Sequence, residues 1–323
     1  MTTDGRWMAA AIALGKRGRG RTAPNPNVGC VIVQGDDVVG RGWTQPGGRP
    51  HAEAMALAEA GERARGATVY VTLEPCAHRS ERGPACADLL VSAEVARVVA
   101  ALTDPDPRTA GAGFQRLRAP GIEVQEGVEA QAARRSLAGF LTRQARGRPY
   151  ISLKLAMSLD GKIALPSGES RWITGEDARA HVHLERARCD MILVGRGTFD
   201  ADRPALDVRL PGIEDRAPAR AILTRGAAVP GWTRLGGPEE VFGLDGINDL
   251  LVEGGSGAAS AFLAADLIDR MLIYRAPILI GEGKSAIGYV GLTALADAHG
   301  RWDLVDSRLL GRDRLEVYER VRH

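Results

Sequence analysis

Helix-like and strand-like hydrophobic patterns alternate along the first half of the chain. Apolar residues spaced three and four apart predict helices, whereas short runs rich in β-branched residues predict strands. Helices are expected over 4–18, 51–60, 84–93, 111–119 and 129–146. Strands are expected over 67–73, 96–102 and 122–126, after a hairpin over 28–43. Such alternation is typical of an α/β domain in which helices cover both faces of a sheet.

The alternation is interrupted at RQARGRPY, residues 143–150, where glycine and proline break the pattern. A domain boundary here would divide the chain into 1–146 and 147–323. In the second part strands are expected over 150–157, 190–195, 219–224, 248–252 and 271–280. Helices are expected near 176–188 and 256–265, with one short helix over 238–244. The second part therefore reads as another α/β domain.

Composition narrows the class of protein. The 323 residues are 45% hydrophobic and 5% aromatic, which is normal for a globular protein of about two domains. The net charge of +2 lacks the basic excess expected of a nucleic-acid-binding protein. Four cysteines are too few and too scattered for a disulfide framework, and no apolar run is long enough to span a bilayer. We expect a cytoplasmic protein that binds small molecules rather than nucleic acid or a membrane.

One segment, HAEAMALAEAGERARGATVYVTLEPCAHRSERGPAC, concentrates metal-binding side chains. His51 offers an imidazole nitrogen, and Cys76 and Cys86 offer two thiolates. Catalytic zinc has three protein ligands of these types and keeps a fourth position open. The segment therefore predicts a catalytic zinc site. Cys30, within an apolar strand, and Cys189, at a helix end, have no ligand partner nearby in the sequence and are expected to be ordinary core or surface residues.

Glu53 follows the histidine by two residues and is the expected proton shuttle, not a ligand. Residues two apart do not share a helix face, but both side chains converge if they lie in the first turn, which Pro50 favours. The His-x-Glu and Pro-Cys elements match those of zinc deaminases. Nine residues separate the two cysteines, a spacing that points away from cytidine and tRNA-adenosine deaminases.

Two other classes of function remain at this point. A nucleic-acid base deaminase with an unrelated C-terminal domain would need a basic, aromatic-lined path for the flipped base, and the composition offers neither. A non-catalytic protein with structural zinc would need a fourth ligand, for which His78 is the candidate, and would leave Glu53 without a role.

The motifs together resemble those of a known family. TAPNPNVGCVIV, HAEAMAL and TLEPCAH…GPAC are similar to the deaminase half of the bifunctional riboflavin-biosynthesis deaminase/reductase family. YISLKLAMSLDGKIALPSGESRWIT, DRPALDVR and VEGGSGAASAFL are similar to its reductase half. The resemblance covers nearly the whole chain, in the family's order.

The resemblance implies two folds and two reactions. Residues 1–146 would form a cytidine-deaminase-like three-layer α/β/α domain, and residues 147–323 a dihydrofolate-reductase-like α/β domain. The first would use zinc hydroxide to deaminate 2,5-diamino-6-(5-phosphoribosylamino)pyrimidin-4-one. The second would use NADPH to reduce the ribosyl group to ribityl. A homodimer or higher homo-oligomer is also expected.

The resemblance also implies site residues. Two positions near the reacting ribose would be catalytic, namely Lys154 and Asp202. Substrate-binding positions would be Asn25, Ser170, Arg186, Leu206, Arg209 and Glu253. Cofactor-binding positions would be Ala156, Trp172, Thr198, Asp202, Gly255, Ser256 and Gly257. For Trp172 a packing role in the core or at a dimer contact is an equal alternative to a nicotinamide contact.

The chain departs from the family at two places. Thr44 stands where relatives often have histidine, so a phosphate contact would fall to Arg49, Arg79 or Arg82, unless these are solvated surface charges. The segment 210–252 is shorter than usual, and Thr224-Arg225 follows a strand where relatives often have an acidic residue. Two outcomes stay open: Arg225 holds the 2′-phosphate of NADPH, or reduction is impaired and the protein is a deaminase alone.

Overall fold

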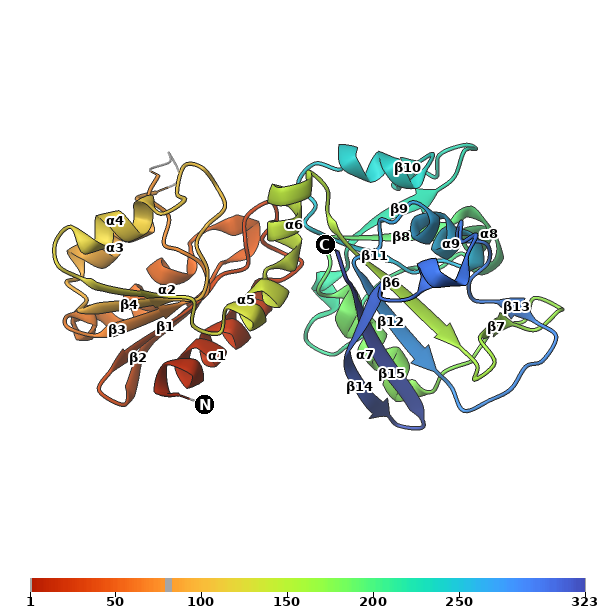
Figure 1. The fold of residues 1–323 in the computed structure, drawn as a ribbon, viewed down its shortest axis with the longest axis horizontal. Coiled ribbons are helices and arrows are strands. Elements are labelled where there is room, and N and C mark those ends of the chain that lie inside the picture. Colours follow the sequence, from red (N-terminus) through yellow and green to blue (C-terminus); the bar gives the residue numbers. More distant parts are fainter. Residues whose placement is uncertain (1, 79–82, 323) are drawn as a thin grey trace. The chain divides into compact units, whose positions relative to one another are not determined.

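The computed structural model describes residues 2–78 and 83–322. The chain forms two compact units, Met1–Gly147 and Arg148–His323, and each is built around its own sheet (Figure 1). Within the described residues, no helix has the length and apolar character needed to cross a membrane.

The N-terminal unit contains a five-stranded sheet in the order β2-β1-β3-β4-β5. β1 pairs antiparallel with β2 and β3, and β4 lies parallel between β3 and β5. The strands are β1 (Gly29–Gln34), β2 (Asp37–Trp43), β3 (Thr68–Val71), β4 (Arg97–Ala100) and β5 (Glu123–Glu126). The helices are α1 (Thr3–Gly15), α2 (Ala52–Ala60), α3 (Cys86–Ser92), α4 (Ala112–Arg118), α5 (Ala130–Ser136) and α6 (Ala138–Arg146).

Helices cover both faces of this sheet. α1 packs on β1 and β3 and contacts α5, while α2 packs on β1 and β2 and contacts α3, which in turn contacts α4. Figure 1 shows α3 and α4 on one side of the sheet and α1 and α5 on the other. The unit is therefore the three-layer α/β/α structure that the alternating pattern predicted.

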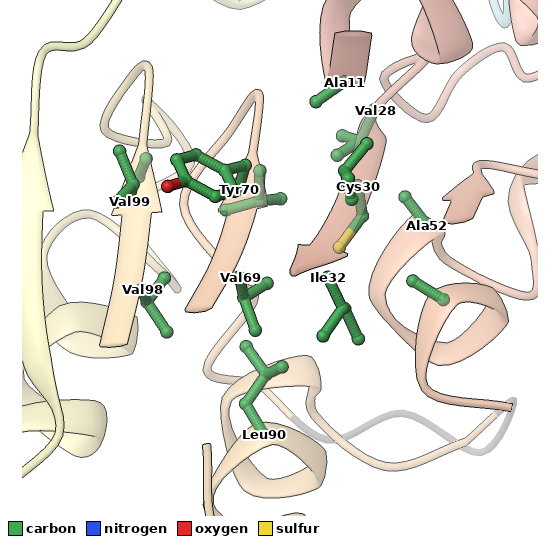
Figure 2. Close-up of a cluster of buried hydrophobic side chains, with 14 of the residues drawn as sticks. Ala11, Val28, Cys30, Ile32, Ala52, Val69, Tyr70, Leu90, Val98 and Val99 are labelled. Carbon is green, nitrogen blue, oxygen red and sulfur yellow. The ribbon is translucent and has the colours of Figure 1, made fainter. Parts of the chain in front are cut away.

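Alternate side chains of the strands contribute to opposite layers of the core of the N-terminal unit. Neighbouring side chains of a strand point to opposite faces. Figure 2 shows Val69 and Val98 on the same side as Leu90 of α3, while Tyr70 and Val99 point the other way. Cys30 is fully buried in this core.

Two glycines of β2 let α2 lie directly on the sheet. A Cβ atom at Gly40 would stand 2.2 Å from the carbonyl oxygen of Ala56, and one at Gly42 would stand 2.1 Å from that of Ala52. Both distances are far below van der Waals contact, and the obstructing atoms belong to the backbone of the helix. Glycine at these positions therefore fixes how closely the start of α2 approaches β2.

The second unit contains an eight-stranded sheet in the order β10-β9-β8-β11-β6-β12-β15-β14. From β10 to β12 neighbouring strands are parallel, and β15 and β14 complete the sheet antiparallel. The strands are β6 (Tyr150–Met157), β8 (Met191–Gly195), β9 (Ala219–Leu223), β10 (Thr233–Leu235), β11 (Asp249–Val252), β12 (Arg270–Arg275), β14 (Trp302–Leu310) and β15 (Asp313–Arg320). A separate two-stranded sheet joins β7 (Lys162–Ala164) and β13 (Lys284–Ser285).

Two hydrophobic clusters cover the faces of the large sheet. One contains Leu193 of β8 together with residues of α9 (Ser256–Ala264). The other contains Ile192 and Val194 of the same strand together with residues of α7 (Glu176–Arg186), and Cys189 is buried in it. Alternate residues of one strand thus serve both layers, and this unit too is α/β with helices on both faces.

The structure departs from the sequence-based expectations in several elements. The helix expected over 129–146 is two helices, α5 and α6, that meet at Leu137. The strand expected over 271–280 ends at Arg275. Several elements were not anticipated, namely β7, α8 (Arg196–Asp202), β10, β13, β14 and β15. The short segment 210–252 accordingly contains a strand, β10, beyond the expected short helical turn Pro238–Gly243.

A buried ion pair secures the start of the second unit. Arg148 donates through Nη1 and Nη2 to the two carboxylate oxygens of Asp269, at 2.6 and 2.8 Å. The backbone N–H of Ile151 donates to the same carboxylate at 2.9 Å. Since Asp269 directly precedes β12 and Ile151 lies in β6, this contact holds two adjacent strands at their amino ends.

We expect Gly42→Ala to weaken the N-terminal unit, because its methyl group would push α2 away from β2. Overpacking of this kind costs about 1–3 kcal/mol of unfolding free energy. Urea denaturation followed by circular dichroism measures the loss. Gly35→Asn is the matched control, since Gly35 has φ +62°, which asparagine tolerates, and a Cβ atom at Gly35 would meet no other atom within 4 Å. Equal stability of Gly42→Ala and the parent protein would contradict the assigned role of Gly42.

Candidate functional site

Three side chains of the N-terminal unit meet with the geometry of a tetrahedral metal site. His51 Nδ1 lies 3.3 Å from Cys86 Sγ and 3.6 Å from Cys76 Sγ. All three ligand atoms lie within 4.8 Å of one another. In a tetrahedral zinc site with ordinary Zn–N and Zn–S bonds, neighbouring ligand atoms are about 3.5–3.8 Å apart. The expected ligands therefore lie together, at distances that suit Zn²⁺.

Each ligand is positioned by a different element. His51 is the residue that caps α2, Cys76 follows β3 in a loop, and Cys86 is the first residue of α3. The hydrogen bond from the Cys86 thiol lowers the pKa of Cys76 to about 4, and the Cys86 backbone N–H donates to the same sulfur at 3.3 Å. That shared hydrogen bond, together with burial, raises the pKa of Cys86. The protein thus favours a thiolate at Cys76, which is the form that binds metal.

Glu53 is the second residue of α2 and lies in its first turn, two residues after the N-cap residue His51. The side chains of His51 and Glu53 therefore both lie at the start of the helix, which answers the objection that residues two apart do not share a face. Glu53 is buried, and burial raises its pKa to about 7, although the nearby His51 opposes the rise. A carboxyl group with such a pKa gains and loses a proton near neutral pH, as a general acid and base must.

Three protein ligands distinguish this cluster from a structural zinc site. Within residues 2–78 and 83–322, it is the only group of three or more His, Cys, Asp or Glu ligand atoms close enough to hold one ion. His78 does not join it, and its Nδ1 atom lies 3.3 Å from the hydroxyl of Thr109. Structural zinc normally has four protein ligands, so the arrangement favours a catalytic site.

Glu74 is a buried residue of the site that the sequence analysis missed. Its carboxylate accepts hydrogen bonds from the backbone N–H groups of Asp104, Gly111, Gly113 and Phe114, at 2.9–3.2 Å. It thereby ties the segment before Cys76 to the start of α4. A charged residue directly after the apolar run VYVTL was the available signal, since a carboxylate at such a position has to find donors.

Asn25, the expected substrate-binding residue, lies against the segment that leads to His51. A Cβ atom at Gly48 would stand 1.7 Å from Asn25 Nδ2, and Gly48 has φ +85°. Only glycine suits both conditions at this position. Thr44 is buried, and its hydroxyl accepts a hydrogen bond from Val28 N at 3.0 Å, so it is a packing residue rather than an exposed substitute for the family's histidine.

Of the basic residues considered for phosphate binding, only Arg49 belongs to the described part of the chain. It immediately precedes Pro50 and His51, and its Nη1 atom lies close to Gly83. Arg79 and Arg82 lie outside the described residues.

The second candidate site lies at the carboxyl ends of parallel strands in the C-terminal unit. Lys154 and Ala156 are two residues apart on β6 and therefore share a face of the sheet. Glu253 directly follows β11, which pairs with β6. Lys154 Nζ lies 4.0 Å from a Glu253 carboxylate oxygen. The structure therefore brings together an expected catalytic residue and an expected substrate residue.

Arg186, at the end of α7, binds Glu253 in a fork. Its Nε and Nη2 atoms donate to the two carboxylate oxygens at 2.7 and 2.8 Å, and Nη1 donates to the carbonyl oxygen of Asp207 at 3.1 Å. Burial acts to raise the pKa of Glu253, but the Arg186 hydrogen bonds and charge hold it below its ordinary value. Burial lowers the pKa of Lys154 despite the opposing charge of Glu253. The three side chains form one largely buried charged group, in which Lys154 is the most exposed at 20%.

Most expected cofactor positions lie around the starts of α8 and α9. The backbone N–H of Gly255, which precedes α9, donates to the hydroxyl of Thr198 in α8 at 3.1 Å. Ser256 and Gly257 are the first two residues of α9. Asp202 ends α8 and lies 3.5 Å from Arg171, the residue before Trp172. These positions thus gather at the carboxyl ends of β8 and β11.

Trp172 is not a core residue. Its side chain is 69% exposed, and the guanidinium of Arg179 lies 4.7 Å from its ring centre. The interpretation as a core aromatic is therefore wrong, and a ligand contact or a contact with another subunit remains.

The remaining expected substrate positions differ in exposure. Leu206 is buried in the cluster beneath α7, with φ +54°. Arg209 is exposed and pairs with Asp207 at 3.0 Å, beside the carbonyl group that Arg186 binds. Ser170 is half-buried and adjoins Arg171.

Two family models match the chain. The one described as RibD C-terminal domain matches residues 149–243 and 239–315. The one described as cytidine and deoxycytidylate deaminase zinc-binding region matches residues 1–102.

Similar proteins match both halves together. The riboflavin biosynthesis protein RibD of Escherichia coli is 41% identical over 344 residues, covering 91% of this chain and 94% of that protein. The solved structure of Acinetobacter baumannii RibD, form 1, is 40% identical with a TM-score of 0.89 and covers 99% of both chains. The Thermotoga maritima diaminohydroxyphosphoribosylaminopyrimidine deaminase/5-amino-6-(5-phosphoribosylamino)uracil reductase is 31% identical with a TM-score of 0.89, covering 98% of this chain and 99% of that one.

We expect the purified protein to contain about one zinc ion per chain. Cys76→Ser and Cys86→Ser should each lose most of this zinc, because an alcohol replaces a thiolate ligand. Elemental analysis after dialysis against a weak chelator measures the metal content. Cys189→Ser is the control and should keep its zinc, since Cys189 is buried in the other unit. Stoichiometric zinc in both ligand variants would refute the ligand set.

Proposed function

Because this chain belongs to the family of bifunctional riboflavin-biosynthesis deaminase/reductases, we propose that its two sites catalyse consecutive steps on one phosphorylated pyrimidine. The chain is a deaminase with a zinc-binding region, followed by a reductase. Its units have the expected cytidine-deaminase-like and dihydrofolate-reductase-like folds. The observation that carries the assignment is the triangle of His51, Cys76 and Cys86 beside the buried Glu53.

The proposed first substrate is 2,5-diamino-6-(5-phosphoribosylamino)pyrimidin-4-one. Zn²⁺, when bound, lowers the pKa of a coordinated water toward about 7 and so supplies hydroxide near neutral pH. Glu53 would accept the water proton and deliver it to the ring nitrogen as the ring carbon is attacked. It would then accept the proton of the newly added hydroxyl group and deliver it to the amino group, which departs as ammonia while the ring carbonyl forms. Its pKa of about 7 suits a group that must carry protons in both directions.

Asn25 and the basic residues near the metal ligands would orient this substrate. Asn25 is the proposed contact to the pyrimidine, since it lies against Gly48 in the segment before His51. Arg49 is a proposed contact to the 5′-phosphate because it lies two residues before His51 and a guanidinium binds phosphate through two parallel hydrogen bonds.

The proposed second reaction reduces the ribosyl group to ribityl. NADPH, when bound, supplies the hydride for the ribose carbon that bears the nitrogen. Lys154 is the proposed proton donor to this sugar, because burial lowers its pKa and thereby eases release of a proton. Glu253, held by Arg186, keeps the ammonium of Lys154 at a fixed position. Asp202 and Trp172 would contact the cofactor beside Thr198 and Gly255.

The two alternatives to a bifunctional enzyme fare differently. A base deaminase with an unrelated C-terminal domain is excluded, because that half matches the RibD C-terminal domain. A deaminase with a degenerate reductase half would be expected to have lost its buried charges. The largely buried charged group of Lys154, Glu253 and Arg186 instead supports a working reductase site.

Assembly and cellular location are part of the proposal. Leu304 and Leu309, which are 55% and 69% exposed on the edge strand β14, support a homodimer or higher homo-oligomer. None of the four cysteines forms a disulfide, which supports action in the reducing cytoplasm.

We expect Glu53→Gln to keep its zinc and to lose deamination by about 10²–10⁴-fold, because glutamine cannot carry the proton. Ammonia release from the diaminopyrimidine substrate measures the effect. The control is reduction of the deaminated intermediate by the same variant, which should be unchanged because that site lies in the other unit. Near-normal ammonia release would remove Glu53 from the mechanism.

We expect Lys154→Met to show the opposite pattern. Methionine retains the length of the side chain but has no proton to donate, so NADPH oxidation with the deaminated intermediate should fall by about 10²–10⁴-fold. Deamination should remain. Failure of the parent protein itself to oxidise saturating NADPH, while folded, would show that the protein is a deaminase alone.

A further inference from the structure

Four neighbouring parallel strands present their carboxyl ends along one edge of the second sheet, in the order β9-β8-β11-β6. The strands are in register, with Leu223 of β9 opposite Gly195 of β8, and Val252 of β11 opposite Leu193 of β8 and Leu153 of β6. Adjacent strands lie about 4.8 Å apart, so β9 lies about 14 Å from β6. In open α/β sheets, dinucleotides bind across such strand ends.

The cofactor positions already described fix the direction of NADPH along this edge. Lys154 and Ala156 belong to β6, where the hydride must be delivered. Thr198 and Gly255 follow β8 and β11, where the N–H groups at the start of α9 favour phosphate. The adenosine end of the cofactor is therefore expected at the end of β9.

Hydrogen bonds hold the turn after β9. The Thr224 hydroxyl accepts a hydrogen bond from Gly226 N at 3.0 Å, and its backbone N–H donates to the carbonyl oxygen of Leu235 in β10 at 2.8 Å. Arg234 Nη1 donates to the Thr224 carbonyl oxygen at 3.2 Å. The short strand β10, which was not expected from the sequence, thus supports this turn.

Arg225 stands exposed at this turn, between Thr224 and Gly226. Its guanidinium forms no ion pair with any residue of the described chain. The other arginine at the adjoining strand end, Arg196, is paired with Asp200 at 2.8 Å. Arg234 also lies at this turn, but its guanidinium donates to the Thr224 carbonyl oxygen and supports the turn itself. Arg225 is therefore the available cation where the adenosine ribose is expected.

The charge of the surrounding segment suits a dianion. Between the acidic pairs Glu214-Asp215 and Glu239-Glu240, residues 216–238 carry four arginines and no aspartate or glutamate, and Arg225 lies near the middle of this stretch. Enzymes that prefer NADH hold the ribose 2′-hydroxyl with an acidic residue, whereas an arginine near this place accommodates a 2′-phosphate. The turn after β9 presents an arginine, Arg225, and so suits a 2′-phosphate.

We propose that Arg225 binds the 2′-phosphate of NADPH and is the residue that makes this reductase select NADPH over NADH. The inference rests on the proposed reductase function and names its specificity determinant. A guanidinium that meets a phosphate forms charge-assisted, commonly paired hydrogen bonds, for which NADH offers no acceptor group.

Titration calorimetry of the full-length protein with NADPH, NADH, 2′,5′-ADP and 5′-AMP tests the proposal without turnover. Arg225→Gln should weaken binding of NADPH and 2′,5′-ADP by about ten- to a hundredfold. Binding of NADH and 5′-AMP should stay within about twofold, since neither carries the 2′-phosphate. Arg312→Gln removes the same charge at the exposed turn between β14 and β15, at the other end of the sheet, and should change none of the four affinities.

The possible outcomes test the role of Arg225 and the reductase function separately. Loss of the preference for NADPH in Arg225→Gln alone supports the assignment. Equal affinity of the parent protein for NADPH and NADH, or a preference that Arg225→Gln retains, overturns the role of Arg225 and leaves the reductase function standing. Failure of the folded parent protein to bind NADPH overturns both.

Discussion

Both active sites depend on carboxylates that are buried within the protein and compensated to different degrees. A buried anion is costly unless hydrogen bonds or an opposite charge replace its water. Glu74 receives four backbone N–H groups, and Glu253 receives the fork of Arg186. Glu53 receives no arginine and no lysine among the described residues, and its pKa rises to about 7. The same constraint is therefore met by hydrogen bonds at Glu74, by an arginine at Glu253 and by a raised pKa at Glu53.

This difference in surroundings suits the roles proposed for the three carboxylates. Glu74 binds backbone N–H groups at the start of α4, and Glu253 is bound by Arg186, which holds the pKa of Glu253 below its ordinary value. In the proposed mechanism Glu53 alternates between its two protonation states, which a carboxylate bound to arginine would resist. The number of hydrogen-bond donors around a buried glutamate thus decides which role suits it. Many donors suit a structural contact, and few suit proton transfer.

The chemistry of the metal site could be predicted from the sequence, since histidine and cysteine at this spacing have few other uses and Pro50 marks the helix start that brings Glu53 beside the ligand. The pairing of Arg186 with Glu253 could not be predicted, because the two residues are far apart in the chain and meet only through the sheet.

Several strands could not be predicted either. β10 is three residues long and exists by pairing with β9. β14 and β15 contain many charged residues, which hid their period of two. The tight contact of Gly42 with α2 likewise leaves no local signal, because glycines of turns look the same in the sequence.

Each unit has its own sheet and its own hydrophobic core. Packing in one half therefore imposes no direct restraint on substitutions and deletions in the core of the other. A lineage can shorten the chain around β9 and β10, or retune the choice of cofactor, while the ligands of the metal site stay fixed by α2, α3 and their strands. The fused gene can in this way evolve as two proteins that share one messenger and one expression level.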